Sequence, residues 1–148
     1  MNGVIASDEC FTAFNQMKLK KTDRFIIFKL TDDQSRIEVE KRGGPDASFD
    51  DFVAALPDKE CRWAALAIAV QTKSGATDPH RLLFVSWCAG SSPIRAKMMH
   101  AASKAALKGG LEGLSGEIHA SAVGELQFEE VYLKAGGVLP ATGLPAAA

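Results

Sequence analysis

The sequence predicts a single domain of the α/β (α+β) class, with a central mixed β-sheet of about five strands and helices on both of its faces. Three observations support this prediction. Runs of apolar, β-branched and aromatic residues alternate with stretches whose apolar residues recur at helical spacing. Turn residues separate these stretches, and no linker or internal repeat divides the chain. A chain of 148 residues can also bury one sizeable core, so one domain is the default.

The first helix is predicted from Ser7 to about Lys20. Ser7 is expected to be its N-cap, followed by acidic residues in the first turn, where the helix dipole favours carboxylates. The spacing of Cys10, Phe14 and Met17 places them on one buried side of this helix. The residues before Ser7 show no reason to be packed, so we expect them to form an exposed arm.

The five strands are predicted from apolar runs bounded by turn residues. The first two form a hairpin, and the second of them alternates apolar and charged residues as a half-exposed strand does. The third is rich in alanine and is ambiguous between helix and strand, but flanking turn residues favour a central strand. The fourth is apolar throughout and is also expected to be central. These strands are Arg24–Leu30, Ser35–Lys41, Cys61–Thr72, His80–Trp87 and Glu117–Ser121.

Two shorter helices complete the predicted domain. The first begins at the cap Ser48 and runs to Leu56, and the second closes the domain over residues 125–134. We expect Leu126, Val131 and Phe128 of the closing helix to face inward. The domain is therefore predicted to span residues 1–135, and the Gly/Pro/Ala-rich residues 136–148 are predicted to be a flexible tail.

The most informative stretch is a long helix predicted from Pro93 to the paired glycines Gly109 and Gly110. Proline suits the first helical position, a serine before it can cap the helix, and the glycines end it. At about 100° per residue, one narrow arc is apolar and is expected to face a core. An adjoining arc of roughly 40° carries a row of lysines, which is usually solvated but can also form a contact face for an acidic partner. The apolar arc is Ile94, Met98, Ala101 and Ala105, and the lysine row is Lys97, Lys104 and Lys108.

Composition excludes several classes of function. The net charge of −1 gives no bulk reason for nucleic-acid or membrane binding. No segment reaches the about 18 consecutive apolar residues of a membrane span, and the N-terminus lacks the pattern of a signal peptide, so a cytoplasmic protein is expected. The three cysteines are Cys10, Cys61 and Cys88, an odd number at wide spacings. A disulfide framework or a zinc site is therefore not expected, and a reducing compartment is the simpler interpretation.

Enzymatic signatures are scarce. The sequence contains no phosphate-binding glycine motif and no nucleophile elbow. His80, His100 and His119 are isolated, and none has a partner at metal-ligand spacing, so each is expected on the surface or satisfied in the core. We predict no catalytic residue, no metal ligand and no cofactor, and hence a protein that is not an enzyme.

Three motifs resemble the ADF/cofilin family of actin-binding proteins. The segment SSPIRAKMMHAASKAALKGGL is similar to the long actin-binding helix of that family, closely so from Ser92 to Leu107. GGPDASFDDFVAALPDKECRWA resembles the segment ending in LP(D/E)xDCRYA. GVIASDEC and the following FNQMKLKK are similar to the opening of the family. The motifs occur in order over roughly residues 2 to 135, which makes the resemblance specific.

The resemblance implies a function. Members of this family have a mixed sheet flanked by helices, bind actin monomers with a preference for the ADP form, and bind and sever or depolymerise filaments. The implied partner is therefore actin in the cytoplasmic cytoskeleton, and the chain is expected to be a monomer. Matched residue by residue, the implied actin-binding residues are Gly3, Val4, Ile5, Ala6, Ser7, Arg95, Lys97, Met98, Lys104 and Lys108, and the implied filament-binding residues are Arg81 and Lys134.

Departures from the family pattern also carry expectations. Asn2 stands where many members carry a regulatory serine, so phosphorylation at that position is not available. Ala105, Gly109 and Pro79 replace charged residues of the pattern, and the charge cluster of the last helix is reduced to Lys134. Fewer charges on the filament-only surface should weaken side binding, so we predict that monomer binding outlasts filament severing.

Two alternatives from other classes remain open. One is a membrane-surface module that responds to phosphoinositides and uses the same lysines. The other is an enzyme with an unrecognised site, which would show a deep pocket lined by perturbed carboxylates or histidines.

Overall fold

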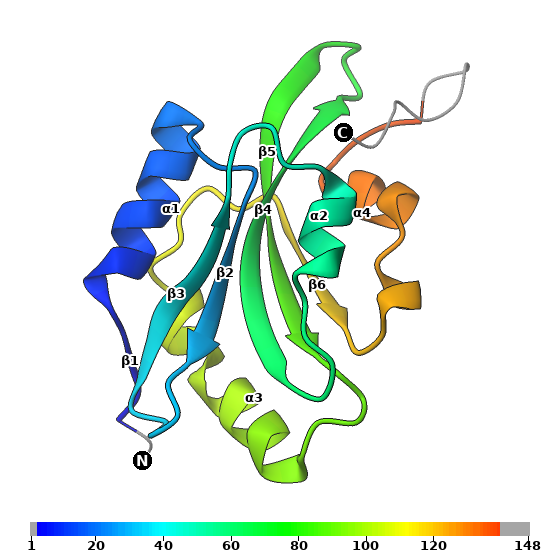
Figure 1. Cartoon of the computed structure of the whole chain (residues 1–148). Coiled ribbons are helices and arrows are strands. Elements are labelled where there is room, and N and C mark those ends of the chain that lie inside the picture. The colour runs from blue at the N-terminus through cyan, green and yellow to red at the C-terminus, as the bar shows by residue number, and fades with distance from the viewer. Residues whose placement is uncertain (1–2, 140–148) are drawn as a thin grey trace.

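The computed structural model describes residues 3–139, which form a six-stranded mixed sheet with helices on both faces (Figure 1). The strand order is β1-β3-β2-β4-β5-β6. The four inner strands pair antiparallel, while β1 pairs parallel with β3 at one edge and β6 pairs parallel with β5 at the other. The predicted class is therefore confirmed, with one strand more than expected.

The helices and strands occur in the predicted order along the chain. The extra strand comes from the predicted arm, and the predicted closing helix is divided into a short 3₁₀ turn and a helix that begins later. The elements are β1 Ile5–Ala6, α1 Asp8–Lys20, β2 Phe25–Leu30, β3 Arg36–Gly43, α2 Phe49–Ala54, β4 Cys61–Gln71, β5 Thr77–Cys88, α3 Ile94–Lys108, β6 Gly116–Ala120, η1 Val123–Glu125 and α4 Phe128–Lys134.

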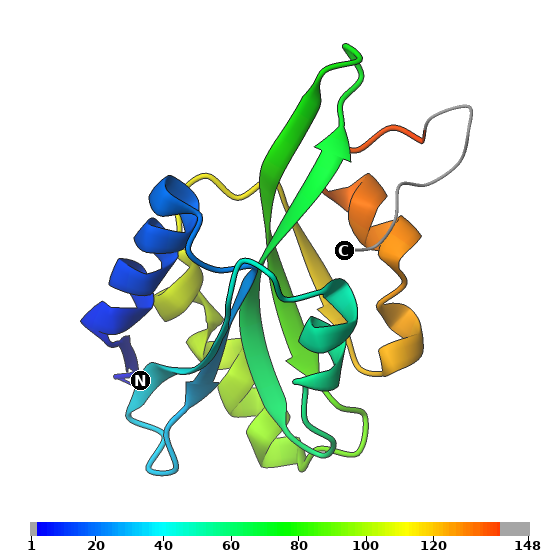
Figure 2. The same ribbon diagram turned by 45° about the horizontal axis from the view of Figure 1, so that its top comes forward.

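Two apolar clusters lie on opposite faces of the sheet. Helices α1 and α3 cover one face, where Phe14 and Leu107 pack with Trp63 of β4. Helices α2 and α4 cover the other face, where Phe52 and Tyr132 are buried (Figure 2). Because both faces of β4 are covered, residues 63–68 in its middle are apolar on both sides of the strand, and the buried Arg62 before them pairs with Glu40 and Glu60. The alanine-rich segment is therefore the central strand that the flanking turns favoured.

The helix starts show where local sequence decides structure. Ser48 and Asp51 form a reciprocal capping box at α2, with Asp51 N donating to Ser48 Oγ at 3.0 Å and Ser48 N donating to the Asp51 carboxylate at 2.9 Å. Ser7 holds the N-cap position of α1 as predicted, but its hydroxyl makes no capping bond and lies 3.5 Å from the Cys10 sulfur instead.

The expectation of unpaired cysteines is wrong for two of the three. Cys61 and Cys88 form a disulfide bond, whereas Cys10 is a buried free thiol. The two bonded residues are 27 positions apart in the sequence. They are direct partners in the β4–β5 register, at the first residue of one strand and the last residue of the next. Spacing along the chain did not reveal the pair because strand register, not sequence distance, brings the sulfurs together.

The C-terminal part packs on α4 and β4. Leu126 and Val131 are buried and Phe128 packs against the same cluster, as predicted. The Tyr132 hydroxyl accepts a hydrogen bond from Gln71 N at 2.9 Å and donates to Val138 O at 3.3 Å. Most of the predicted flexible tail, residues 140–148, lies outside the described residues. Within the described range, no helix is long and apolar enough to cross a bilayer.

Candidate functional site

The N-terminal segment is not the free arm that the sequence predicted. Ile5 and Ala6 form β1 and pair in parallel with Arg36 and Ile37 of β3. Val4 is buried, whereas the Ile5 side chain is 58% exposed. Two residues are too few to show the alternating pattern by which a strand is predicted from sequence. They form a strand here because the edge of β3 offers unpaired backbone groups for hydrogen bonding. Residues 1–2, including Asn2, lie outside the described part of the chain.

Helix α3 lies beside β1 (Figure 1). It begins at Ile94, so Pro93 is the flanking N-cap residue and not the first helical residue as predicted. No side chain caps this end: Ser92 is buried and its hydroxyl has no partner among the described residues. The backbone of Ser92 instead closes a turn by donating to Ala89 O at 2.8 Å. The helix ends at Lys108, before Gly109, as predicted.

The face of α3 that packs on the sheet is the opposite of the predicted one. Ile94 is 76% exposed and Met98 is 66% exposed. Ala101 and Ala105 are exposed as well. The buried residues of the helix are His100, Ser103 and Leu107, two of which are polar. Alanines occur on several sides of this helix, so the periodicity of apolar residues does not by itself identify the buried side. The buried side also carries two polar residues, and for this reason the prediction selected the opposite side.

His100 is satisfied in the core, one of the two placements predicted for the histidines. Its Nε2 lies 2.8 Å from Arg62 O, and its ring stacks on Trp63 with centroids 4.3 Å apart. Burial lowers the pKa of His100 below the ordinary value, so the ring is neutral near neutral pH. Arg62 and Trp63 of β4 therefore satisfy the polar His100 ring on the buried side of α3.

The basic residues of α3 fall into two groups. Arg95 is exposed and its guanidinium lies 3.4 Å from the Gln34 side chain, while Lys97 Nζ donates to Gly90 O at 2.8 Å. Lys104 and Lys108, in contrast, both pair with the carboxylate of Glu117 on β6. In the predicted lysine row, Lys104 and Lys108 thus share one carboxylate, whereas Lys97 has a neutral hydrogen-bond partner.

Glu117 was not identified from the sequence as a site residue, because its partners come from another element. Burial alone would raise the pKa of Glu117, but hydrogen bonds from Lys104 and Lys108 outweigh it and hold the pKa below the ordinary 4.5. His119 also contacts this carboxylate, at 3.0 Å. The carboxylate is therefore ionised near neutral pH, so it holds both lysines toward β6.

We expect Glu117→Gln to lower the free energy of unfolding by about 1 kcal/mol near neutral pH, because two partly exposed ion pairs are lost. The folded pKa is depressed, so the stabilisation is present above the ordinary pKa of 4.5 and is lost as pH falls through the lower folded pKa. Urea unfolding should therefore show the variant and the wild type converging in acid. Glu112→Gln, which changes an exposed glutamate outside this ion pair, serves as the control. A constant difference at all pH values would contradict the assignment.

The two residues predicted to bind filaments, Arg81 and Lys134, lie near each other and away from Arg95 and Lys97 of α3. Arg81 of β5 pairs with Asp78 at 2.7 Å and donates to Ala135 O at 3.2 Å, just after α4. Lys134, the last residue of α4, is exposed. The β4–β5 hairpin projects at the end of the molecule opposite α3 (Figure 2). Arg81 therefore has structural partners within the chain, whereas Lys134 is accessible.

The chain resembles known proteins over almost its whole length. The profile of the cofilin/tropomyosin-type actin-binding proteins matches residues 3–136. A cofilin of Yarrowia lipolytica is 37% identical over 130 residues, covering 88% of this chain and 84% of the relative. An actophorin of Acanthamoeba castellanii is 33% identical over 135 residues, covering 91% and 96%. The crystal structure of a Streptomyces griseoflavus cofilin superposes with a TM-score of 0.82 at 34% identity, covering 96% of this chain and all of the other.

Proposed function

The chain belongs to the family of cofilin/tropomyosin-type actin-binding proteins, and on this premise we propose that it binds actin monomers and filaments and promotes filament depolymerisation. One observation carries the proposal: α3 exposes an apolar edge that the fold itself does not use. Ile94 and Met98 form this edge, Arg95 and Lys97 flank it, and Ile5 of β1 is exposed on the neighbouring strand. We call these five residues the α3 edge.

The chemistry of the α3 edge suits a protein partner with an apolar cleft and an acidic rim. Full burial of exposed Ile94 and Met98 by a partner would contribute roughly 1.5–3 kcal/mol of favourable binding free energy for each side chain. An amphipathic helix commonly recognises a groove in this way, with its apolar residues as anchors. Arg95 and Lys97 stand at the border of the apolar residues, where cations raise the association rate and select an acidic partner. We infer that the rim of the actin cleft supplies those acidic groups.

Preference for one state of actin would account for depolymerisation without bond chemistry. A ligand shifts a conformational equilibrium only by its difference in affinity between the two states. We propose that the chain binds ADP-actin more tightly than ATP-actin, and that it binds and severs filaments by favouring a subunit arrangement that weakens neighbouring contacts. The protein would then act as a monomer on the cytoplasmic actin cytoskeleton and carry out no catalysis.

We expect filament side binding to be about fivefold weaker than monomer binding, because exposed charge pairs contribute up to about 1 kcal/mol and several are absent here. Pro79 and Gly109 replace basic residues of the family pattern, and Arg81 is already paired with Asp78. Fluorescence titration of labelled ADP- and ATP-actin monomers measures the affinity for monomers, and co-sedimentation measures the affinity for filaments. Filament binding as tight as monomer binding would contradict this prediction.

The variant Pro79→Lys restores a positive charge at a position where the family pattern has a basic residue. It should strengthen co-sedimentation and leave monomer titration unchanged, since position 79 lies on β5 and not on the α3 edge. Absence of binding to both monomers and filaments by the folded wild type would contradict the proposed function itself.

A phosphoinositide-binding role remains a weaker candidate. Lys104 and Lys108 are held by Glu117, so an anionic head group would have to compete with that carboxylate. Of the predicted lysine row, Lys97 alone has no carboxylate partner within the described residues. Co-flotation with phosphoinositide vesicles at physiological salt, in the presence and absence of actin, distinguishes the two roles.

A further inference from the structure

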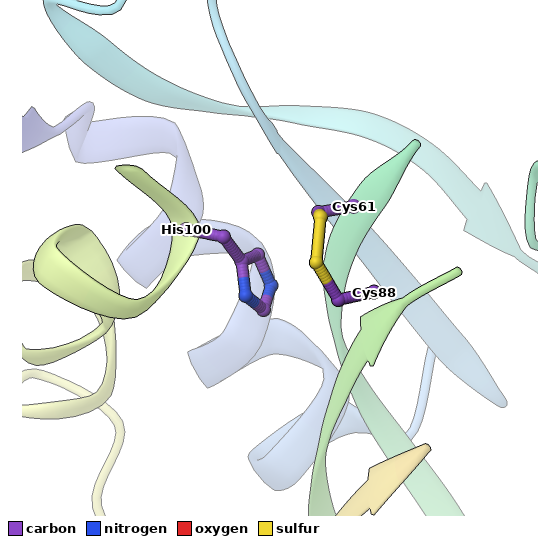
Figure 3. A group of neighbouring side chains, drawn as sticks. All are labelled: Cys61, Cys88 and His100. Carbon is purple, nitrogen blue, oxygen red and sulfur yellow. A yellow bond between two sulfur atoms is a disulfide. The ribbon is translucent and has the colours of Figure 1, made fainter. Parts of the chain in front are cut away.

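Three potential metal ligands from different parts of the chain meet where the middle of α3 packs against β4 and β5. The Cys61 and Cys88 sulfurs and a ring nitrogen of His100 all lie within 4.8 Å of one another. Figure 3 shows the His100 side chain on α3 turned toward the disulfide that joins β4 and β5. Both cysteines are partly exposed, and His100 is buried. The proposed actin-binding function uses none of these side chains.

The His100 ring is held in place by residues next to Cys61. Arg62 O lies 2.8 Å from Nε2, and Trp63 stacks on the ring nearly parallel, at an interplanar angle of 11°. Two consecutive residues of β4, Arg62 and Trp63, thus fix the ring relative to the Cys61 sulfur that precedes them. Rigid support of this kind is what a metal ligand requires, because a preoriented histidine loses less freedom when it binds.

We propose that Cys61, Cys88 and His100 form a redox-gated site for Zn²⁺, closed by the disulfide and opened by a thiol reductant. Two thiolates and one neutral imidazole are common zinc ligands, and a fourth position is left for water. A depression of about 440 Å³ beside Cys88 and His100 gives water access to that position. Two thiolates also neutralise the charge of the ion, and the nearby Lys104 is already paired with Glu117.

The distances fit zinc after a small change. Zinc bonds are about 2.3 Å to sulfur and about 2.0–2.1 Å to nitrogen, so a tetrahedral ion sets its sulfur and nitrogen ligands about 3.6 Å apart. The present separations of up to 4.8 Å must therefore shorten by about 1 Å. The two sulfurs must move apart to about 3.8 Å, which cleavage of the disulfide permits.

Thiol–disulfide exchange opens the site. A small-molecule thiol attacks one sulfur of the disulfide as a thiolate and forms a mixed disulfide, which releases the other cysteine as a thiolate. A second thiol completes the exchange, so the external thiols are oxidised to their disulfide and Cys61 and Cys88 are reduced. Zn²⁺ then binds both sulfurs as thiolates, and their protons pass to solvent. In the reverse exchange a small-molecule disulfide takes up two electrons and leaves as two thiols, the Cys61 and Cys88 sulfurs rejoin, and Zn²⁺ is released because two of its three protein ligands are lost.

The test uses Co²⁺ as a spectroscopic probe on the full-length chain. Reduced protein, freed of reductant without air, should bind one Co²⁺ per chain with thiolate-to-cobalt charge-transfer absorption, and Zn²⁺ should displace it. The oxidised chain should show no such absorption. This comparison needs no variant, and circular dichroism shows that the reduced chain is folded under the conditions of the titration. Equal cobalt binding by both forms, or one ion shared between two chains, would overturn the proposal.

Variants identify the ligands. Reduced Cys10→Ala and reduced His119→Ala should bind Co²⁺ like the wild type, since these residues lie outside the cluster. Reduced Cys88→Ala should lose the absorption, and reduced His100→Ala should bind at least about tenfold more weakly. Circular dichroism confirms that each variant is folded. Wild-type affinity in folded His100→Ala, or loss of the absorption in Cys10→Ala, would also overturn the proposed ligand set.

Discussion

Replacing both Arg95 and Lys97 with alanine is expected to weaken actin-monomer binding at least about tenfold, equivalent to about 1.4 kcal/mol. Both residues belong to the basic half of α3 that has no carboxylate partner within the described residues, so a partner need not break an ion pair to reach them. Arginine is also enriched among the residues that dominate binding energy at interfaces. Fluorescence titration of labelled ADP-actin monomers measures the change.

Two controls make this result interpretable. The double variant Lys20→Ala with Lys41→Ala removes the same charge from exposed positions on α1 and β3, outside the α3 edge. It should leave monomer affinity within about twofold of the wild type, because distant exposed charges contribute little. Lys108→Ala should likewise have a small effect, since Glu117 already holds that lysine. Unchanged binding by a folded Arg95→Ala/Lys97→Ala protein would exclude the α3 edge as the actin-binding site.

Reduction of the Cys61–Cys88 disulfide is expected to lower the free energy of unfolding by about 3 kcal/mol. The bond joins residues 27 positions apart, and closing a loop of this length restricts the unfolded chain. It also ties the start of β4 to the end of β5, directly before the turn that leads into α3. Urea unfolding of oxidised and reduced protein, both in the presence of a metal chelator, measures the difference.

The matched control is the variant Cys88→Ala, which cannot form the bond. Its stability should be close to that of the reduced wild type, and adding reductant should change nothing further. Cys10→Ala should retain the full response to reductant, because its thiol is free in both states. Equal stability of the oxidised and reduced wild type would show that the bond does not stabilise the fold.

Much of the fold was predictable because it depends on local pattern. The order of strands and helices, the central position of β4 and the cap at Ser48 each follow from a few neighbouring residues. The motif around Arg95 and Lys97 was also recognisable from residue order alone. These features need no knowledge of what lies across the sheet, and so a single sequence is sufficient to predict them.

The structure corrected the predictions that depended on which residues meet. The sequence predicted that Ile94 and Met98 would face the core, but the exposed side of α3 carries both. Apolar periodicity cannot choose between two arcs when alanine occupies both and the buried arc contains His100 and Ser103. The arm became β1 for a related reason: two residues form a strand only because the edge of β3 is free beside them.

The sequence by itself thus determined the fold class, the order of the elements and the family to which the chain belongs. Only the tertiary structure decided which edge of α3 is free for a partner, that Glu117 pairs with Lys104 and Lys108, and that Cys61, Cys88 and His100 meet. The physical reason is the range of the interactions. Propensity and capping act over a few residues, whereas ion pairs, disulfides and burial depend on distances that strand register and helix packing set.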